Sequence, residues 1–510
     1  MSIKYINLLN NTFNYDSLFN EQNNLNSLKG GTINSYDKYI LLSCHEFNYV
    51  VDEIISQDIQ NNRILSINNS QNANASQFNI STSDTNIDVT QGNITEITQF
   101  LKDIIIDFDD VVKTTTILEL INIPKYKELF ARSKNNYETA NFFRGFINWA
   151  TYPDKTPDIK MNANTVKKLK GAKIIFFAYF SFNELNATPI IDQLLFLNSL
   201  NHYGVDEINI VLPYFPVGTM ERIVGEGEIP TGYALAQMIN SIPSGSSKNK
   251  IYIFDIHALC SRFFFHTNTI PILITLMPKY LDYIESEYPT SNNTVVLQQQ
   301  SNSRPTSSSR TITRLNEAIA LSNEAITQSN LNIIVFPDDG AKKRFAKLLP
   351  KDTKTITCSK TRQGTTRIIK IDEGLEHLEK ITSSTSLVNN INLFIIDDLV
   401  QSGGTLIKTI EGIQTQIKDT YPTLTDKVKY FTLVTHSILP NADTKFLDYK
   451  NITKIITSDT RPLKIKEITK HLQDANNTSK LEVMKISDVI YKIFTSNEEK
   501  YNYIAPYSIK

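Results

Sequence analysis

Cysteine is scarce in this chain, and no two cysteines lie close together in the sequence. Only Cys44, Cys260 and Cys358 occur in 510 residues. Structural zinc sites need closely spaced ligands such as C-x-x-C, and small secreted folds need a dense set of cysteines for disulfides. The sequence has neither pattern. We therefore expect a protein of a reducing compartment, with the cytoplasm as the default location.

Charge of one sign and long apolar runs are also lacking. The chain has 52 Lys and Arg residues against 53 Asp and Glu residues, a net charge of −1. This balance gives no support for nucleic-acid or membrane-surface partners, and no apolar run approaches the ~20 residues of a membrane helix. The start, MSIKYINLLNNTFNYDS, resembles neither a signal peptide nor an Arg-rich transit peptide, so we expect no targeting segment.

Two stretches are dominated by Asn, Ser, Thr and Gln. They cover residues 63–100 and 290–311, and residues 1–30 are similarly rich in Asn. Such tracts contain too little apolar surface to offset the entropy lost on ordering, which predicts disordered insertions and a flexible N-terminus. Residues 100–140 contain two helical patterns, ITQFLKDIIIDF and YKELFARS.

Elsewhere, short apolar runs alternate with helical patterns. Runs that predict buried strands lie at residues 39–44, 146–151, 172–180, 207–215, 251–257, 331–339, 353–360, 391–398, 428–436 and 452–459. Helical patterns lie at 46–56, 189–204, 229–242, 341–349, 405–417 and 464–473. This alternation predicts an α/β fold with mainly parallel sheets. Its length predicts two units in tandem, 31–272 with an insertion at about 63–140, and 273–510 with an insertion at about 290–311.

The most informative segment is LFIIDDLVQSGGTLI, residues 393–407. A buried strand leads into Asp397 and Asp398, and a turn with two glycines leads into a helical pattern. Glycines let the backbone approach an anion, and the first N–H groups of a helix point toward it. Paired carboxylates would repel a phosphate, but they suit ribose hydroxyls or a metal-bound sugar. The segment therefore predicts a site for a phosphorylated ribose.

Residues 394–406 resemble the phosphoribosyl-pyrophosphate (PRPP) motif of type I phosphoribosyltransferases and PRPP synthetases (ribose-phosphate diphosphokinases). Other segments resemble the PRPP synthetases in that family's order, and together they span residues 38–62 and 143–490. They include VLPYFPVGTMER (211–222), IYIFDIHALCSRFFF (251–265), VFPDDGAKKRF (335–345) and CSKTRQGTTR (358–367). LVTHSILPNA (433–442) and IITSDTRPL (455–463) resemble the strand ends that follow the PRPP site in that family. The segments GTMER, FPDDGA and DDLVQSGGT resemble most closely those of the cytosolic-type plant branch of the family.

The resemblance implies two tandem type I phosphoribosyltransferase-like domains and a homo-oligomer. It also implies Mg²⁺-dependent transfer of the pyrophosphoryl group of ATP to ribose 5-phosphate, which yields AMP and PRPP for nucleotide biosynthesis. Phosphoryl transfer depends on positioning and charge neutralisation, which the residues of these segments could supply.

The resemblance also assigns roles to individual residues. Ribose 5-phosphate and PRPP are assigned to Asp397, Asp398, Gln401, Ser402, Gly403, Gly404 and Thr405, with Asp397 the stronger of the two acids. ATP is assigned to Arg222 and His257, the metal to Asp255, His257 and Asp338, and catalysis to Lys360 and Arg362.

Local patterns add three expectations about these residues. Two cations on a Gly-containing loop can neutralise the migrating group and then release product, which fits Lys360 and Arg362. Asp255 and His257 are two positions apart on an expected strand, so their side chains should lie on the same side. Asp339 could be the N-cap of the helix at 341–349.

Several positions depart from the family pattern. Gln401 replaces an acid, and His266 falls where an acid is common. Thr219 and Met220 stand where most members have Arg and Gln. Lys155, in YPDKTPDI, replaces a glycine, and a positive φ there would strain the lysine by ~1 kcal/mol.

Two other functions are compatible with parts of the pattern. A regulatory homologue with little or no activity would keep the fold but should have lost Lys360, Arg362, His257 or the 397–405 turn, and all are present. A phosphoribosyltransferase that consumes PRPP would have one such unit and no FDIHA or PYFP segment. The sequence therefore favours the diphosphokinase.

Overall fold

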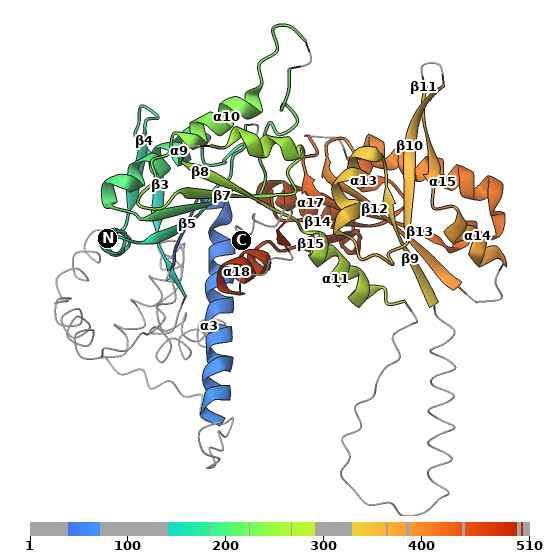
Figure 1. Cartoon of the computed structure of the whole chain (residues 1–510), viewed down its shortest axis with the longest axis horizontal. Helices are drawn as coiled ribbons and strands as arrows, with labels where there is room; N and C mark the ends of the chain where they lie inside the picture. The colour runs from blue at the N-terminus through green and yellow to red at the C-terminus, as the bar shows by residue number, and fades with distance from the viewer. Residues whose placement is uncertain are drawn as a thin grey trace, which may run out of the picture. The chain divides into compact units, whose positions relative to one another are not determined.

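Two mainly parallel sheets, one in each half of the chain, form the framework of the protein (Figure 1). This confirms the predicted α/β class with two units in series. The computed structural model describes residues 39–71, 141–182, 184–223, 225–266, 268–290, 329–363, 366–383, 388–440, 444–496 and 501–502. Residues 1–30, the helices expected within 100–140 and the tract at 291–311 lie outside the described residues.

The first sheet has the strand order β2-β1-β5-β6-β7-β8, and each described pairing in it is parallel. Its strands are β1 (Tyr39–Ser43), β2 (Phe142–Arg144), β5 (Lys173–Phe177), β6 (Glu207–Val211), β7 (Asn249–Phe254) and β8 (Thr269–Ile274). The strand expected at 146–151 forms, but it belongs to a separate antiparallel hairpin of β3 (Ile147–Thr151) and β4 (Pro157–Met161). The hairpin turn holds Lys155 at φ 71°, the strained conformation considered above.

Alternating residues of the first sheet face two different layers of helices. Ile40 and Leu42 of β1 pack in the core with α9 (Ile190–Ser199) and α10 (Thr231–Asn240). Leu41, between them, packs in the core that contains α3 (Asn48–Gln71). This period-two alternation with helices on both faces is the doubly wound arrangement that the sequence predicts.

Helix α3 is much longer than the helix expected at 46–56. It continues to Gln71, so the prediction of a disordered tract beginning at residue 63 was wrong for residues 63–71. Once packing against the sheet has formed the first turns, each further residue adds a backbone hydrogen bond at low entropic cost. No described helix has the combination of length and apolar composition that crossing a membrane requires.

The second sheet has the order β11-β10-β9-β12-β13-β14-β15 and is antiparallel only between β10 and β11. Its strands are β9 (Ser329–Phe336), β10 (Thr355–Gln363), β11 (Thr366–Glu373), β12 (Val388–Val400), β13 (Val428–Ser437), β14 (Ile452–Ser458) and β15 (Leu481–Met484). The chain leaves β9 toward β10 on one side, and β12 lies on its other side. The carboxyl ends of β9 and β12 thus flank a topological switch point, where open α/β sheets bind ligands.

Helices cover both faces of the second sheet. They include α13 (Asp339–Phe345), α14 (Glu376–Ser383), α15 (Gly404–Thr420), α16 (Lys445–Asp448) and α17 (Pro462–Asp474). In the described part of the chain the remaining helices are α8 (Ala163–Lys168), α11 (Met277–Glu287), α18 (Ser487–Ser496) and the 3₁₀ turns η1 (His45–Phe47), η2 (Leu200–Tyr203), η3 (Leu259–Phe264), η4 (Ala346–Leu348), η5 (Pro422–Lys427) and η6 (Thr478–Lys480).

One apolar core is shared by the two sheets. It joins Leu41 and Ile175 of the first sheet to Phe394 and Phe431 of the second, with Val489 of α18 in the same cluster. The rings of Phe394 and Phe431 stack with centroids 4.7 Å apart. Because both sheets bury one face in this core, the residues at their carboxyl ends are held by a common packed interior.

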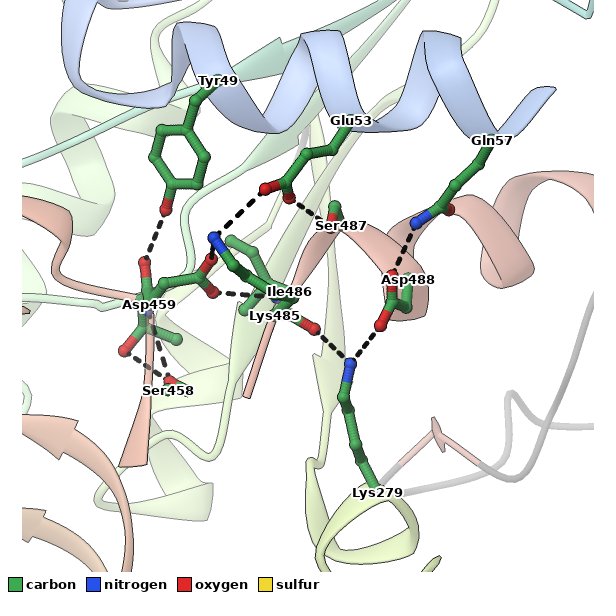
Figure 2. A network of polar contacts seen from close by, with 11 residues as sticks. Tyr49, Glu53, Gln57, Lys279, Ser458, Asp459, Lys485, Ile486, Ser487 and Asp488 are labelled. Carbon is green, nitrogen blue, oxygen red and sulfur yellow. Dashed lines mark hydrogen bonds and ion pairs between the residues drawn. The ribbon is translucent and has the colours of Figure 1, made fainter. Parts of the chain in front are cut away.

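A polar network ties α18 to α3, which comes from the opposite end of the chain (Figure 2). Glu53 and Gln57 lie four residues apart, and so on one side of α3. Glu53 Oε2 accepts from Ser487 Oγ at 2.7 Å, and its Oε1 lies 3.1 Å from Lys485 Nζ. Gln57 Nε2 donates to Asp488 Oδ1 at 2.5 Å.

Asp459, at the end of β14, is the buried member of this network. Its Oδ1 accepts the N–H of Ile486 at 2.8 Å, and Lys485 Nζ lies 3.7 Å from its Oδ2. Tyr49 of α3 donates its hydroxyl to the backbone carbonyl of Asp459 at 3.4 Å. Burial raises the pKa of the Asp459 carboxyl to about 6, although the Ile486 and Lys485 contacts oppose the rise.

This raised pKa predicts how stability depends on pH. Between about pH 4 and pH 6 the folded chain keeps a proton on Asp459 that the unfolded chain releases, so this contribution is present at low pH and is lost as pH rises through about 6. A shift of roughly two units corresponds to about 3 kcal/mol. Asp459→Asn retains an acceptor for Ile486 but cannot titrate. Thermal unfolding should show the variant gaining stability relative to the wild type as pH rises, and a difference independent of pH would contradict this.

Candidate functional site

Candidate residues from both halves meet beside the carboxyl end of β12. Asp398 is buried, with 1% of its surface exposed. Its Oδ2 lies 2.7 Å from Nδ1 of His257, which comes from the first half of the chain. Its Oδ1 forms an ion pair with Nη1 of Arg344, and Nη2 of Arg344 donates to the backbone carbonyl of His257. Asp398 is therefore the anchor that joins His257 to the second sheet.

The two adjacent acids have different electrostatic environments. Burial alone would raise the pKa of Asp398, but the hydrogen bond from His257 and the charge of Arg344 outweigh it and hold the pKa below its usual range. Burial raises the pKa of Asp397, and the charge of Asp398 raises it further. Asp397 Oδ1 accepts the N–H of Asp398 at 2.9 Å, and its side chain is only half-buried. Asp397 is thus the acid better placed to meet a sugar hydroxyl.

This difference predicts opposite effects of two isosteric substitutions on stability. Asp398→Asn removes the charge that pairs with the largely buried guanidinium of Arg344, and removing one partner of a buried pair costs about 3 kcal/mol. Asp397→Asn should cost much less, because the folded state already favours the protonated form of this acid. Denaturant unfolding of the two variants measures the difference. Equal losses of stability would contradict the electrostatic assignment.

The turn after β12 has the geometry of an anion cradle. Gly403 adopts φ 74°, and a Cβ atom there would lie 2.4 Å from Cβ of Phe446, so only glycine fits. Helix α15 begins at Gly404, and its N-cap residue Gly403 has no side chain to cap the first turn. The Gly404 N–H donates to Ser402 Oγ at a long 3.5 Å. Gln401, Ser402 and Thr405 are exposed around this helix start. Free N–H groups, hydroxyls and a close backbone approach are what a phosphate group requires.

Asp255 and His257 do not lie on one side of a strand, and that prediction was wrong. Strand β7 ends at Phe254, and Asp255 adopts φ 32°, so strand alternation no longer applies. Asp255 is buried, and its Oδ2 accepts from Thr435 Oγ1 at 2.6 Å and from the N–H of Leu276 at 3.1 Å. Its Oδ1 has no hydrogen-bond partner among the described residues, and burial raises the pKa of the Asp255 carboxyl. Asp255 therefore belongs to the interior.

Asp338, at the carboxyl end of β9, is the N-cap of α13. Its Oδ1 accepts the N–H of Ala341 at 3.0 Å, and Asp339 is already the first helical residue, so the expectation that Asp339 caps this helix was wrong. The cap falls on Asp338 because its backbone is extended, as an N-cap requires.

A ready-made metal cluster is not found within the described part of the chain, where no three His, Cys, Asp or Glu side chains converge. Mg²⁺ commonly takes only one or two carboxylates from a protein and completes its shell with water and substrate phosphates. Asp338 has a carboxylate of the kind such a partial site needs, and both Asp338 and His257 are half-buried. The buried Asp255, with one oxygen already shared by two donors, does not fit it.

Lys360 and Arg362 lie in a β-hairpin, not in a loop as expected. Strand β10 continues to Gln363, and the backbone of Lys360 pairs with Ile369 and that of Arg362 with Arg367 of β11. The alternating, β-branched sequence of β11 explains why the strand continues. The hairpin forms the edge of the second sheet and projects from it (Figure 1).

Arg222 is exposed on the loop after β6, with Nε 3.2 Å from Glu221 Oε1. Thr219 and Met220 of the same loop are exposed, as is His266 after η3. The beginning of this loop reaches the centre of the candidate site. Tyr214, Phe215, Gly218 and Thr219 line a small pocket together with Ile256, His257, Leu399 and His436, residues of both halves.

Sequence reasoning missed Arg344 and His436. Arg344 stands in a run of three basic residues, and only the fold shows which of them reaches Asp398. His436 is buried, with Nε2 3.0 Å from the carbonyl of Phe254 and Nδ1 3.0 Å from Thr460 Oγ1. Burial lowers its pKa to about 4, so it is neutral and joins β7 to the segment after β14. In the sequence it stands in LVTHSILPNA, at the end of an apolar run.

Comparison with known proteins gives plant relatives that share one name. The chain is 31% identical over 297 residues to ribose-phosphate pyrophosphokinase 3, chloroplastic, of Oryza sativa subsp. japonica, which covers 58% of this chain and 56% of the relative. It is 28% identical over 305 residues to ribose-phosphate pyrophosphokinase 4 of Arabidopsis thaliana, and this match covers 60% of this chain and 71% of the relative. It is 30% identical over 333 residues to ribose-phosphate pyrophosphokinase 3, mitochondrial, of Spinacia oleracea, covering 63% and 65%.

The matches thus span between 56% and 71% of these relatives' own length. No protein-family model matches the chain. Among solved structures, phosphoribosylpyrophosphate synthetase from Mycobacterium smegmatis superposes with a TM-score of 0.45 and 14% identity, over 70% of this chain and 92% of that one.

Proposed function

Because this chain belongs to the ribose-phosphate pyrophosphokinase family, we propose that it transfers the pyrophosphoryl group of ATP to ribose 5-phosphate. In this reaction the C1 hydroxyl oxygen attacks the β-phosphorus. The bond from that phosphorus to the oxygen bridging it to the α-phosphorus breaks, and AMP and PRPP leave. The observation that supports the proposal most strongly is the acid pair and glycine turn after β12, with His257 of the other half bonded to Asp398.

Ribose 5-phosphate has a complementary surface at this turn. The half-buried carboxyl of Asp397 would accept hydrogen bonds from ribose hydroxyls, and the N–H groups at the start of α15 would bind the 5-phosphate. Ser402 and Thr405 add hydroxyl donors, and Gln401 adds an amide. The substrate is then held by groups that do not take part in bond breaking, which is the positioning that phosphoryl transfer requires.

ATP would lie toward the first half of the chain. His257 is oriented by its Nδ1 contact with the ionised Asp398, and it lines the small pocket. Arg222 is the exposed cation of the neighbouring loop. His257 and Asp338 would hold Mg²⁺ together with the phosphates, and the ion when bound would supply positive charge to the triphosphate. Lys360 and Arg362 of the β10–β11 hairpin would neutralise the charge of the migrating group.

The oligomeric state and the cellular location of the protein remain predictions. We propose a homo-oligomer and a cytoplasmic location, and ATP and ribose 5-phosphate as the small-molecule partners. Two of the relatives above carry chloroplastic and mitochondrial in their names, so cell fractionation is the direct test of location.

The nucleotide product tests the reaction itself. With ATP, ribose 5-phosphate and Mg²⁺, the wild-type chain should release AMP, and release should require ribose 5-phosphate. ADP in place of AMP would mean transfer of a single phosphoryl group and would contradict the proposal.

A further inference from the structure

A buried arginine directly after β14 connects the two halves beside the candidate site. Arg461 has 7% of its surface exposed, and its Nη2 forms an ion pair with Oε1 of Glu184, 277 residues away. Its Nη1 donates to the backbone carbonyls of Ser437 at 3.4 Å and Ile438 at 3.3 Å. One guanidinium thus contacts a loop of the first half and the end of β13 in the second.

Glu184 is as buried as its partner. The exposed fraction of its side chain is 6%, against 8% for Arg461. The hydroxyl of the buried Tyr179, just after β5, donates to the other oxygen of Glu184. A buried ion pair is favourable only where further hydrogen bonds satisfy its polar atoms. Both groups here have such partners, although Nε of Arg461 has none among the described residues.

The guanidinium of Arg461 also faces the loop that lines the candidate site. Its Cζ lies 5.1 Å from the ring centroid of Tyr214, and the centroids of the Tyr214 and His436 rings are 5.0 Å apart. Tyr214 lines the small pocket that contains His257. Arg461 therefore lies behind the pocket and supports its wall, without lining it.

The backbone that carries Arg461 is fixed from its other side. Asp459, two residues earlier, is held by Ile486 and Lys485 in the network of Figure 2. Thr460, between them, bonds to His436 and to the carbonyl of Thr435. The turn 459–461 is thus anchored on the α3–α18 side, which gives the Arg461 side chain a rigid base.

We propose that Arg461 is a positioning residue that holds the 213–219 loop against the second half of the chain and so shapes the pocket for the nucleotide. The identity of that nucleotide as ATP rests on the proposed function. The restraint of the loop by Arg461 is independent of the proposed function. Loss of the guanidinium frees Tyr214 from its support, and the loop then exchanges its backbone protons faster and binds nucleotide less well.

The test uses the double variant Arg461→Met/Glu184→Gln. It removes both buried charges together, so the fold is kept, whereas Arg461→Met alone leaves Glu184 buried and unpaired. Hydrogen–deuterium exchange of residues 212–222 should quicken about tenfold in the double variant, while exchange in β12 and α15 stays unchanged. A displaced 213–219 loop should raise the KM for ATP, so that kcat/KM for ATP falls about a hundredfold. The KM for ribose 5-phosphate should stay unchanged.

Arg262→Met is the matched control, since Arg262 also lies over an aromatic ring, 5.5 Å from the exposed Phe263, but not behind the pocket. It should leave exchange and turnover as in the wild type. Unchanged exchange at 212–222 in the double variant overturns the positioning role. A fall in kcat with both KM values unchanged also overturns it, since that is the result of a smaller folded fraction. If the wild type makes no PRPP, the proposed function fails and the exchange result alone decides the role of Arg461.

Discussion

Replacing both Lys360 and Arg362 with alanine should abolish PRPP formation while the chain stays folded. The proposed reaction moves a multiply charged pyrophosphoryl group, and the two cations on β10 are the residues assigned to neutralise it. Removing one preorganised donor or cation typically costs 10²- to 10³-fold in kcat, so the double substitution should cost about 10³-fold or more. The measurement is kcat for AMP release at saturating ATP and ribose 5-phosphate.

The same hairpin supplies the control for this experiment. Lys370 is an exposed lysine of β11, paired in register with Ser359 of β10. Lys370→Ala removes a charge from the same hairpin, and kcat should stay within about twofold of the wild type, because surface substitutions away from special features have small effects. A comparable loss in the Lys370 variant would show that the hairpin's stability, and not the two assigned cations, limits turnover.

Alanine at position 403 should weaken ribose 5-phosphate binding and destabilise the chain. The left-handed conformation of Gly403 costs an L-residue roughly 1–2 kcal/mol. The added methyl would also lie 2.4 Å from Phe446, so either the turn or this buried ring must move. Since the turn is the proposed phosphate cradle, we expect the KM for ribose 5-phosphate to rise about tenfold or more, together with a lower Tm.

Gly404→Ala is the matched control for stability. A Cβ at position 404 would meet only Ser402 Oγ, at an ordinary 3.5 Å, and alanine favours the helix that begins there. The Tm of this variant should equal or slightly exceed that of the wild type. A Gly403→Ala variant with unchanged Tm and unchanged KM would show that the turn tolerates the side chain and would remove the reason for glycine at that position.

The repeating pattern of the sequence was enough to place most strands. The apolar runs at 172–180, 207–215 and 391–398 are long and bounded by turn residues, and they correspond to β5, β6 and β12. Strands β8 and β15 escaped prediction for local reasons. TIPILI contains a proline, which is unusual inside a strand, and LEVM is too short to show a period.

The candidate site was predictable where its chemistry is contiguous in sequence and not where it depends on long-range contacts. The turn at 402–405 could be found because the glycines, hydroxyls and helix start are consecutive. The burial of Asp255 could not be foreseen, because it follows from a positive φ that side-chain patterns do not encode. The Arg461–Glu184 pair could not be foreseen either, because no local sequence pattern identifies two partners 277 residues apart.

The most direct test of the central claim is to follow the phosphorus of both substrates during turnover by ³¹P NMR. With ATP, ribose 5-phosphate and Mg²⁺, the wild-type chain should form AMP and a diphosphate ester at C1 of the ribose in equal amounts, and Asp397→Asn should slow both equally. ADP formation, or AMP released without a new ribose diphosphate, would contradict PRPP synthesis at this site. Binding of both substrates with no product would favour a regulatory homologue instead.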